Sequence, residues 1–352
     1  MIPFQNIRHS APATMDYKKS EAKDWARAHM KGVCNVIMPT FTSDLRRLNE
    51  KAIRHDVRRE IELGFWGALV VSECGTTKEE YVRFLEIVLD EAKGRLKAVV
   101  HGSFDTIEDV IEICKHGERL GAHALLLSYP PTFYPRDDDD IYAYTTQVMD
   151  ATRLATVLFA VHQWNFDRVH PACLSPDLVD RLANAPNAVA IKCEGGGPTN
   201  GALVEILERC GDRLLVSDPR EYSSPAWVKF FGMQWMGTSN FEYFGASVPQ
   251  YFAQMHAGKW KEALETYWRI QPCRTTRLAD MQSFAGANFI HRASWKYQGF
   301  LNGFNGGPLR MPTMRLMDAP TRRLRDAAVR SGLLREDADV SLDSFYVGRN
   351  PA

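Results

Sequence analysis

The sequence has no excess of charge of either sign. Its 352 residues include 43 Lys and Arg against 43 Asp and Glu, which gives a formal net charge of zero. Nucleic-acid-binding proteins normally carry a basic excess or a basic face, so this balance argues against a nucleic-acid partner. The seven cysteines lack Cys-x-x-Cys and Cys/His ligand spacing, and their odd number favours free thiols in a reducing compartment. We therefore predict no metal site.

Long hydrophobic runs are also missing. The first residues contain no apolar stretch of the kind found in signal peptides, and no later stretch is long enough to span a membrane. The cytoplasm is the expected compartment, with no membrane partner. No Gly-x-Gly-x-x-Gly follows the first expected strand, which argues against a dinucleotide site, and we predict no cofactor.

Short apolar runs alternate eight times with longer amphipathic segments. Most of these runs are continuously apolar, as expected of parallel strands that are buried on both faces. Eight strand–helix units predict a (β/α)8 TIM barrel, and a doubly wound open sheet is the alternative. The expected strands cover residues 33–38, 67–72, 97–102, 123–128, 156–161, 188–193, 213–218 and 235–240.

The strand pattern stops near residue 250, and helical patterns follow. We therefore divide the chain into an N-terminal extension (1–31), the barrel (32–250), a C-terminal helical region (251–335) and a tail (336–352). The polar composition of the tail predicts that it is loosely ordered.

Active sites of such barrels lie at the C-terminal ends of the strands. Lys192 ends the sixth expected strand, and Gly75, Thr76 and Thr77 follow the second. Backbone N–H groups, hydroxyls and a helix N-terminus together suit a small carboxylate, although Thr-Thr can also serve only as a helix cap. A desolvated lysine opposite such a cradle can condense with the ketone of a 2-oxo acid to form a Schiff base. A lysine that simply leaves the core for solvent is the alternative.

Five motifs, in order between about residues 32 and 335, resemble those of the dihydrodipicolinate synthase / N-acetylneuraminate lyase family of class I aldolases. They are "GVCNVIMPTF", "GTTKEE", "YPPTFYP", "NAVAIKCEGG" and "GGPLRMPT". The resemblance implies that Lys192 forms the Schiff base, that Thr76 and Thr77 bind the substrate carboxylate, and that Gly75 allows backbone approach. It also implies a homotetramer or homodimer.

The fifth expected strand departs from the family pattern. Where the resemblance implies a catalytic tyrosine, the sequence has Phe159, or Trp164 in an alignment without a gap. Neither side chain carries a phenol, so another group must move protons, and the candidates are His162, Tyr134 and a bound water. Each of the two residues could equally be an ordinary loop residue.

Further substrate contacts are expected in the same loops. The resemblance implies that Arg168 holds a second substrate carboxylate, unless it is a surface arginine, and Ser239 lies at the end of the last expected strand. Aromatic residues are frequent in these loops, which suits a flat or apolar acceptor substrate. In this respect the sequence resembles the hydratase-aldolase branch of the family.

The predicted function is a Schiff-base-forming lyase, either an aldolase or a hydro-lyase, that acts on a 2-oxo acid such as pyruvate. The alternatives are an enzyme of altered chemistry, such as a decarboxylase or hydrolase, and a protein that binds a 2-oxo acid without turnover.

Overall fold

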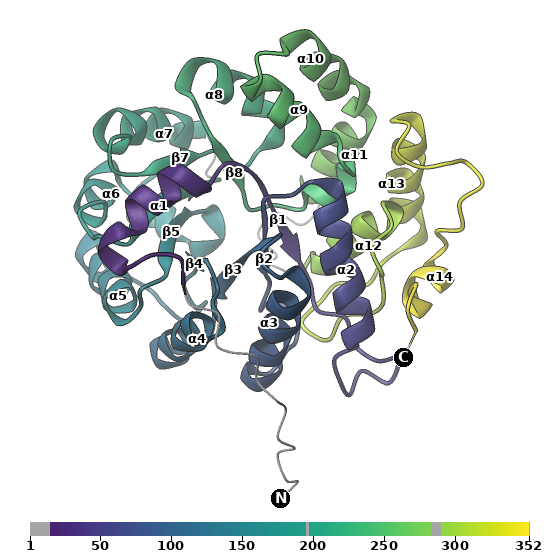
Figure 1. Ribbon diagram of the computed structural model, residues 1–352, viewed down its shortest axis with the longest axis horizontal. Coiled ribbons are helices and arrows are strands. Elements are labelled where there is room, and N and C mark those ends of the chain that lie inside the picture. Colours follow the sequence, from purple (N-terminus) through teal and green to yellow (C-terminus); the bar gives the residue numbers. More distant parts are fainter. Residues whose placement is uncertain (1–14, 195–196, 283–289, 352) are drawn as a thin grey trace, which may run out of the picture.

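The computed structural model describes residues 15–194, 197–282 and 290–351. Within these ranges eight parallel strands form a barrel that is surrounded by helices (Figure 1), so the predicted (β/α)8 TIM barrel is confirmed. The strands are β1 (Gly32–Ile37), β2 (Gly67–Val70), β3 (Lys97–Gly102), β4 (Ala124–Leu127), β5 (Ala155–Ala160), β6 (Ala188–Cys193), β7 (Leu215–Ser217) and β8 (Trp235–Gly237).

The sheet runs in the order β7-β6-β5-β4-β3-β2-β1-β8, so β7 and β8 are its two edges. Where these edges meet, the hydroxyl of Ser217 joins them. Its Oγ accepts a hydrogen bond from the Gly237 N–H at 3.3 Å and donates to the Gly237 carbonyl at 3.5 Å. A side chain therefore completes the barrel at this seam between β7 and β8.

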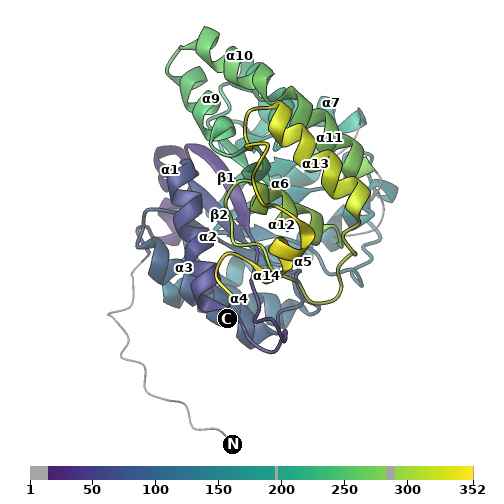
Figure 2. The same ribbon diagram turned by 90° about the vertical axis from the view of Figure 1, so that its right-hand side faces the viewer.

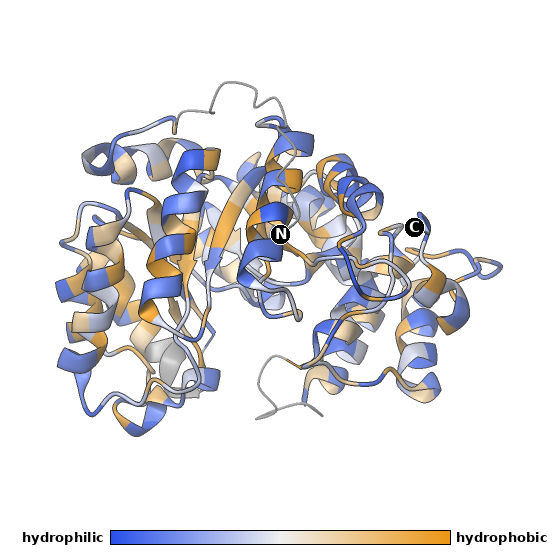
Figure 3. Ribbon diagram, turned by 90° about the horizontal axis from the view of Figure 1, so that it is seen from below, coloured by the Kyte–Doolittle hydropathy of each residue, from blue (hydrophilic) through white to orange (hydrophobic). Residues whose placement is uncertain are grey.

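Helices follow the strands and cover the outside of the barrel. Their apolar residues face the strands and their polar residues face outward (Figure 3). Several begin at a capping side chain, as the sequence pattern predicts. These helices are α2 (Glu50–Leu63), α3 (Lys78–Ala92), α4 (Ile107–Leu120), α5 (Asp138–Ala151), α6 (Pro176–Leu182), α7 (Gly197–Cys210), α8 (Ser224–Phe231) and α9 (Ser247–His256).

The described part of the N-terminal extension packs against the start of the strands. It forms α1 (Ala22–His29), which lies across that end of the barrel (Figure 1). Tyr17 anchors it: the phenol donates to the His123 carbonyl at 2.6 Å and accepts from the Ala155 N–H at 2.7 Å. Residues 1–14 of the predicted extension lie outside the described residues.

The C-terminal region is helical, as predicted, and packs beside the barrel (Figure 2). Every residue of α12 is buried, and Phe345 in the tail contacts Tyr297 and Phe300 with ring centroids 5.5 and 5.6 Å away. The predicted loose order of the tail is wrong at this point, because an aromatic side chain docks there. The helices are α10 (Trp260–Arg269), α11 (Gln271–Gln282), α12 (Arg292–Leu301), α13 (Asp318–Arg330) and α14 (Leu342–Val347).

A cluster of ionisable side chains is buried where α12 meets β1 and α2. It contains Asp56, Glu60, Glu242 and Lys296, each less than 5% exposed. Burial raises the pKa of Glu242 from 4.5 to about 8 and lowers the pKa of Lys296 from 10.5 to about 8. The fold therefore favours the neutral forms of both groups.

From this cluster we predict that the free energy of unfolding falls as the pH rises from about 4.5 to about 8. Because the folded state of Glu242 binds a proton more tightly than the unfolded state, its contribution is complete below pH 4.5 and is lost through pH 8. Glu242→Gln, which mimics the protonated acid, should remove part of this decline. We expect it to gain stability relative to the wild type between pH 5 and pH 8.5, by a few kcal/mol at most, since one pKa unit is worth about 1.4 kcal/mol.

Urea unfolding at a series of pH values measures this difference. The exposed Glu265 provides the matched control, because Glu265→Gln should leave the pH profile unchanged. Parallel profiles for Glu242→Gln and the wild type would contradict the prediction.

Candidate active site

A small cavity of about 40 Å³ lies at the C-terminal end of the barrel. Strands β1 to β6 each contribute one side chain to its wall, and loops and C-terminal helices complete it. The lining residues are Val36, Leu69, His101, Leu126, Phe159 and Lys192 from the strands, Gln163, Glu194 and Thr238 from the loops, and Met281, His291, Arg292 and Trp295 from α11, α12 and the segment before α12. The cavity therefore has the place that catalytic sites have in this fold.

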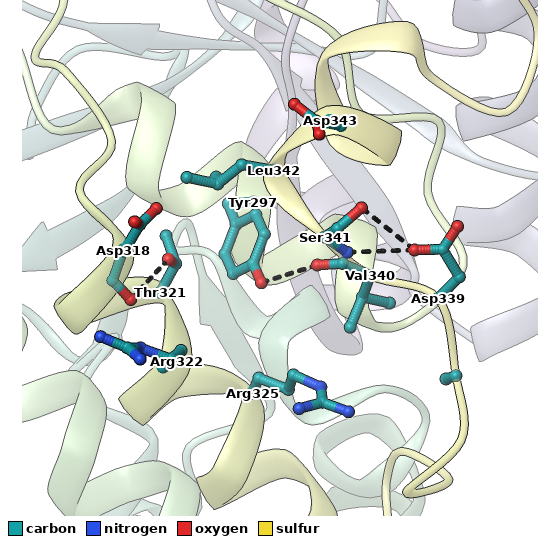
Figure 4. Close-up of a pocket in the computed structure, with 11 residues that line it drawn as sticks. Tyr297, Asp318, Thr321, Arg322, Arg325, Asp339, Val340, Ser341, Leu342 and Asp343 are labelled. Carbon is teal, nitrogen blue, oxygen red and sulfur yellow. Dashed lines mark hydrogen bonds between the residues drawn. The ribbon is translucent and has the colours of Figure 1, made fainter.

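A larger cavity, of about 470 Å³, lies in the C-terminal region between α13 and the segment that leads into α14 (Figure 4). Its lining includes Arg322 and Arg325 on one side and Asp339 and Ser341 on the other. It shares no lining residue with the cavity around Lys192. The chemistry predicted from the sequence therefore belongs to the smaller cavity.

Lys192 is the central group of the small cavity and is only 4% exposed. Its Nζ lies 2.5 Å from Glu194 Oε1, donates to Thr238 Oγ1 at 3.3 Å, and sits 3.9 Å from the centroid of the Phe159 ring. Burial lowers the pKa of the Lys192 amine below its ordinary 10.5, and the Glu194 carboxylate opposes this effect only in part. The amine is thus closer to its nucleophilic, uncharged form than a lysine in water.

The polar side chain of His101, on β3, forms another part of the cavity wall. The Ser72 N–H donates to His101 Nδ1 at 3.3 Å, and His101 Nε2 lies 3.0 Å from Ser128 Oγ. Burial lowers the pKa of His101 to about 4, so the ring is neutral at pH 7. Because a backbone N–H can only donate, Nδ1 is the acceptor and the proton lies on Nε2.

An ion pair next to His101 connects the barrel to α12. Arg292 Nη2 donates to Glu73 Oε2 at 2.9 Å, and Ser103 Oγ donates to Glu73 Oε1 at 2.7 Å. The pKa of Glu73 is held below its ordinary value, because His101 and Arg292 outweigh the effect of burial. The Arg292 guanidinium is therefore held in the cavity wall by a charge-assisted hydrogen bond to Glu73.

Phe159 lines the cavity, and Trp164 lies behind it. Phe159 is the register partner of Lys192 in the neighbouring strand. Trp164 Nε1 donates to the Phe159 carbonyl at 3.0 Å, and the two rings meet edge to face at 5.4 Å. Phe159 contacts the amine directly, whereas Trp164 supports the backbone of Phe159.

The Gly-Thr-Thr loop lies beside the start of α3. Thr77 caps that helix by accepting from the Glu80 N–H at 3.2 Å, and Thr76 Oγ1 donates to the Ser72 carbonyl at 3.1 Å. Gly75 has φ +78°, and an added Cβ there would lie 2.4 Å from Arg310 Cβ. These three residues are absent from the described lining of the Lys192 cavity, so carboxylate binding by them stays a prediction.

Tyr134 and His162, the candidate proton carriers predicted from the sequence, are more exposed than Lys192. Tyr134 is 70% exposed, and the Arg168 guanidinium stacks 3.5 Å from the centroid of its ring. His162 is exposed and its Nδ1 lies 3.9 Å from Cys173 Sγ. Ser239 accepts a hydrogen bond from Arg277 Nη2 at 2.8 Å. The roles of these four residues stay predictions, since the described cavity lining includes none of them.

Sequence reasoning missed Glu194, Thr238, His101 and Arg292. Glu194 could have been found, because residues two apart on an extended chain face the same side and it lies two residues after Lys192. No local sequence pattern places Arg292 near Lys192. It comes from a helix 100 residues further along the chain and reaches the cavity only through the tertiary fold.

The described residues contain no group of three or more His, Cys, Asp or Glu side chains placed to hold a metal ion. None of the helices found there combines the length and the apolar character needed to cross a membrane.

Comparisons with known proteins agree with the fold and the motifs. The model of the dihydrodipicolinate synthetase family matches residues 29–293. The 4-hydroxy-tetrahydrodipicolinate synthase of Methanopyrus kandleri is 25% identical over 56% of this chain, and the match spans 65% of that protein, less than two thirds of its length. The synthase of Clostridium perfringens is 24% identical over 87% of this chain and 99% of its own. The solved dihydrodipicolinate synthase of Thermotoga maritima has a TM-score of 0.72 at 18% identity, with 87% of this chain and 100% of that one covered.

Proposed function

Because the chain belongs to the dihydrodipicolinate synthetase family, we propose that it is a lyase that forms a Schiff base between Lys192 and a 2-oxo acid. The observation that carries the proposal is the buried amine of Lys192, the next-to-last residue of β6, in a cavity at the C-terminal end of the barrel strands. Its lowered pKa supports the same role, since only an uncharged amine attacks a ketone.

The cavity also supports the substrate class. A 2-oxo acid has a ketone for Lys192 and a carboxylate for a cation, and Arg292 provides a cation in the same wall. Pyruvate, the smallest methyl ketone of this class, is the proposed test substrate. The apolar side chains of Leu69, Leu126 and Phe159 line the rest of the wall, which favours an apolar or aromatic acceptor.

The Schiff base supplies the driving force for bond making and breaking. The protonated imine withdraws electrons from the neighbouring carbon, so a bond to that carbon can be formed or cleaved without a cofactor. Aldol cleavage, aldol condensation and dehydration all use this property. Assembly into a homodimer or homotetramer, and the roles of Thr76, Thr77, His162, Tyr134, Arg168 and Ser239, remain part of the proposal.

Reductive trapping tests the proposal. Incubation of the wild-type protein with pyruvate and borohydride should add one reduced pyruvate to the protein, and peptide mapping should place it on Lys192. Borohydride without pyruvate is the control. Protein that stays unmodified at saturating pyruvate would contradict the proposed function.

The absence of a hydroxyl group on the Phe159 ring favours a second candidate function. Phe159 contacts the Lys192 amine but has no hydroxyl to move a proton. An enzyme of altered chemistry, such as a decarboxylase or hydrolase, or a protein that binds a 2-oxo acid without turnover, would need no phenol there. Thermal stabilisation by pyruvate without a trapped adduct would favour the non-catalytic alternative.

A further inference from the structure

We propose that Glu194 carries protons to and from the Schiff base at Lys192, in the place of a phenol. This inference rests on the proposed function and names the group that performs its proton transfers. The evidence is the contact between Glu194 Oε1 and Lys192 Nζ at 2.5 Å, together with the place of both side chains in the wall of one cavity.

Local geometry explains this contact. Lys192 is the next-to-last residue of β6, and Glu194 follows the strand with its N–H bonded to the Ala160 carbonyl of β5 at 2.8 Å. The extended chain thus continues past Cys193, and residues 192 and 194 face the same side. Glu194 has an exposed side-chain fraction of 29%, against 6% for Lys192. It can therefore exchange protons with water and still contact the buried amine.

The other neighbours of the amine are less suited to this task. The Phe159 ring, 3.9 Å from Nζ, has no exchangeable proton. Thr238 Oγ1, at 3.3 Å, can hold the amine in place by a hydrogen bond. A hydroxyl of this kind neither releases nor accepts protons readily near pH 7, whereas a carboxylate does both.

The proton transfers balance with Glu194 as the only carrier. The Lys192 ammonium gives one proton to the Glu194 carboxylate, and the neutral amine attacks the ketone carbon of the 2-oxo acid. The nitrogen–carbon bond forms as the carbonyl electrons move to oxygen. Glu194 protonates this oxygen, accepts a second proton from the nitrogen, and passes it to the hydroxyl, which leaves as water. The products are a protonated imine with one N–H, one water and the Glu194 carboxylate.

The same carboxylate can then act on the carbon next to the imine. With pyruvate it removes a methyl proton, and the electrons of the C–H bond move toward the imine nitrogen to give an enamine. Return of a proton from the Glu194 acid reverses the step. In D₂O this cycle replaces the methyl hydrogens of pyruvate by deuterium, so it can be followed without knowledge of the natural acceptor.

A purely electrostatic role for Glu194 predicts the opposite result. Its carboxylate opposes the lowering of the Lys192 pKa that burial causes. If Glu194 were only a counter-ion, Glu194→Gln would lower the amine pKa further. More neutral amine would then be present at pH 7, and the adduct would form as fast as in the wild type or faster.

The experiment compares the wild type, Glu194→Gln and Glu194→Asp between pH 6 and 9. Two rates are measured: trapping of pyruvate on Lys192 by borohydride, and loss of the pyruvate methyl proton signal in D₂O. For Glu194→Gln we expect both rates to fall on the order of 10²–10⁴-fold at every pH, the usual contribution of a general acid–base. Glu194→Asp keeps the carboxylate and should restore part of both rates. Circular dichroism shows whether each variant folds.

Thr238→Val is the matched variant at the other polar contact of the amine. It removes a hydrogen bond without removing an acid, so it should slow both rates much less than Glu194→Gln. Rates for Glu194→Gln that equal or exceed those of the wild type would overturn the inference. His162→Ala gives a second check, since a loss there with none in Glu194→Gln would assign the proton transfers to His162. No adduct in the wild type would instead refute the proposed function itself.

Discussion

Replacement of Lys192 by Met is expected to abolish trapping of pyruvate and to lower turnover by a factor on the order of 10⁴–10⁶, the range seen when a covalent nucleophile is removed. Met keeps most of the volume of the side chain and has no amine, so the cavity wall stays filled. Lys192→Ala should give the same chemical result. The measurement is mass spectrometry of the borohydride-treated protein together with the pyruvate exchange rate.

The chain provides a matched control in Lys296, a second buried lysine. Its Nζ donates to the Pro39 carbonyl at 2.7 Å, and burial lowers its pKa to about 8. Lys296 therefore has a desolvated amine but lies outside the described lining of the Lys192 cavity. Lys296→Met should still trap pyruvate on Lys192. An adduct that persists in Lys192→Met would show that the reactive amine had been misassigned.

The barrel could be predicted from the sequence because each buried strand is marked locally. The run at 188–193 coincides with β6, and the run at 97–102 with β3. The weaker run at 213–218 is longer than the strand it contains, the three-residue β7. Continuous apolar stretches identify strands, but hydrogen-bond register decides where they end.

The site was only partly predictable. Lys192 and Phe159 lie on strands, whose side-chain direction follows from the pattern of the chain, and both line the cavity. Thr77 sits at the start of a helix, where one motif permits both a cap and a ligand contact, and the structure shows the cap. The contributions of Met281, Arg292 and Trp295 depend on how the C-terminal helices pack on the barrel, which no local pattern specifies.

Loss of one buried ion pair should have the largest effect on stability. Arg274 on α11 and Glu221, in the turn before α8, are 3% and 0% exposed, and two hydrogen bonds of 2.8 and 3.0 Å join them. The Tyr251 phenol also donates to Glu221 at 3.0 Å. Arg274→Leu leaves this carboxylate buried without its cation, so we expect a loss of about 3–5 kcal/mol in the free energy of unfolding.

Urea denaturation measures this loss, and two further variants define its origin. Arg274→Leu combined with Glu221→Gln should cost less than Arg274→Leu, because the uncompensated charge is gone. Arg335→Leu, in an ion pair with side chains 83% and 68% exposed, should have a much smaller effect. Equal losses for Arg274→Leu and Arg335→Leu would contradict the prediction.

The seam between β7 and β8 has a consequence for where the barrel unfolds locally. Most neighbouring strands are held by a ladder of backbone hydrogen bonds, whereas the hydroxyl of Ser217 bridges this pair. Local unfolding begins where the fewest bonds must break, so hydrogen exchange at the Gly237 amide should be faster than in the middle of β3 or β4. Thr238, which contacts the Lys192 amine, follows β8 directly. Lys192 is therefore placed beside this seam, and brief opening there would expose its buried amine to water.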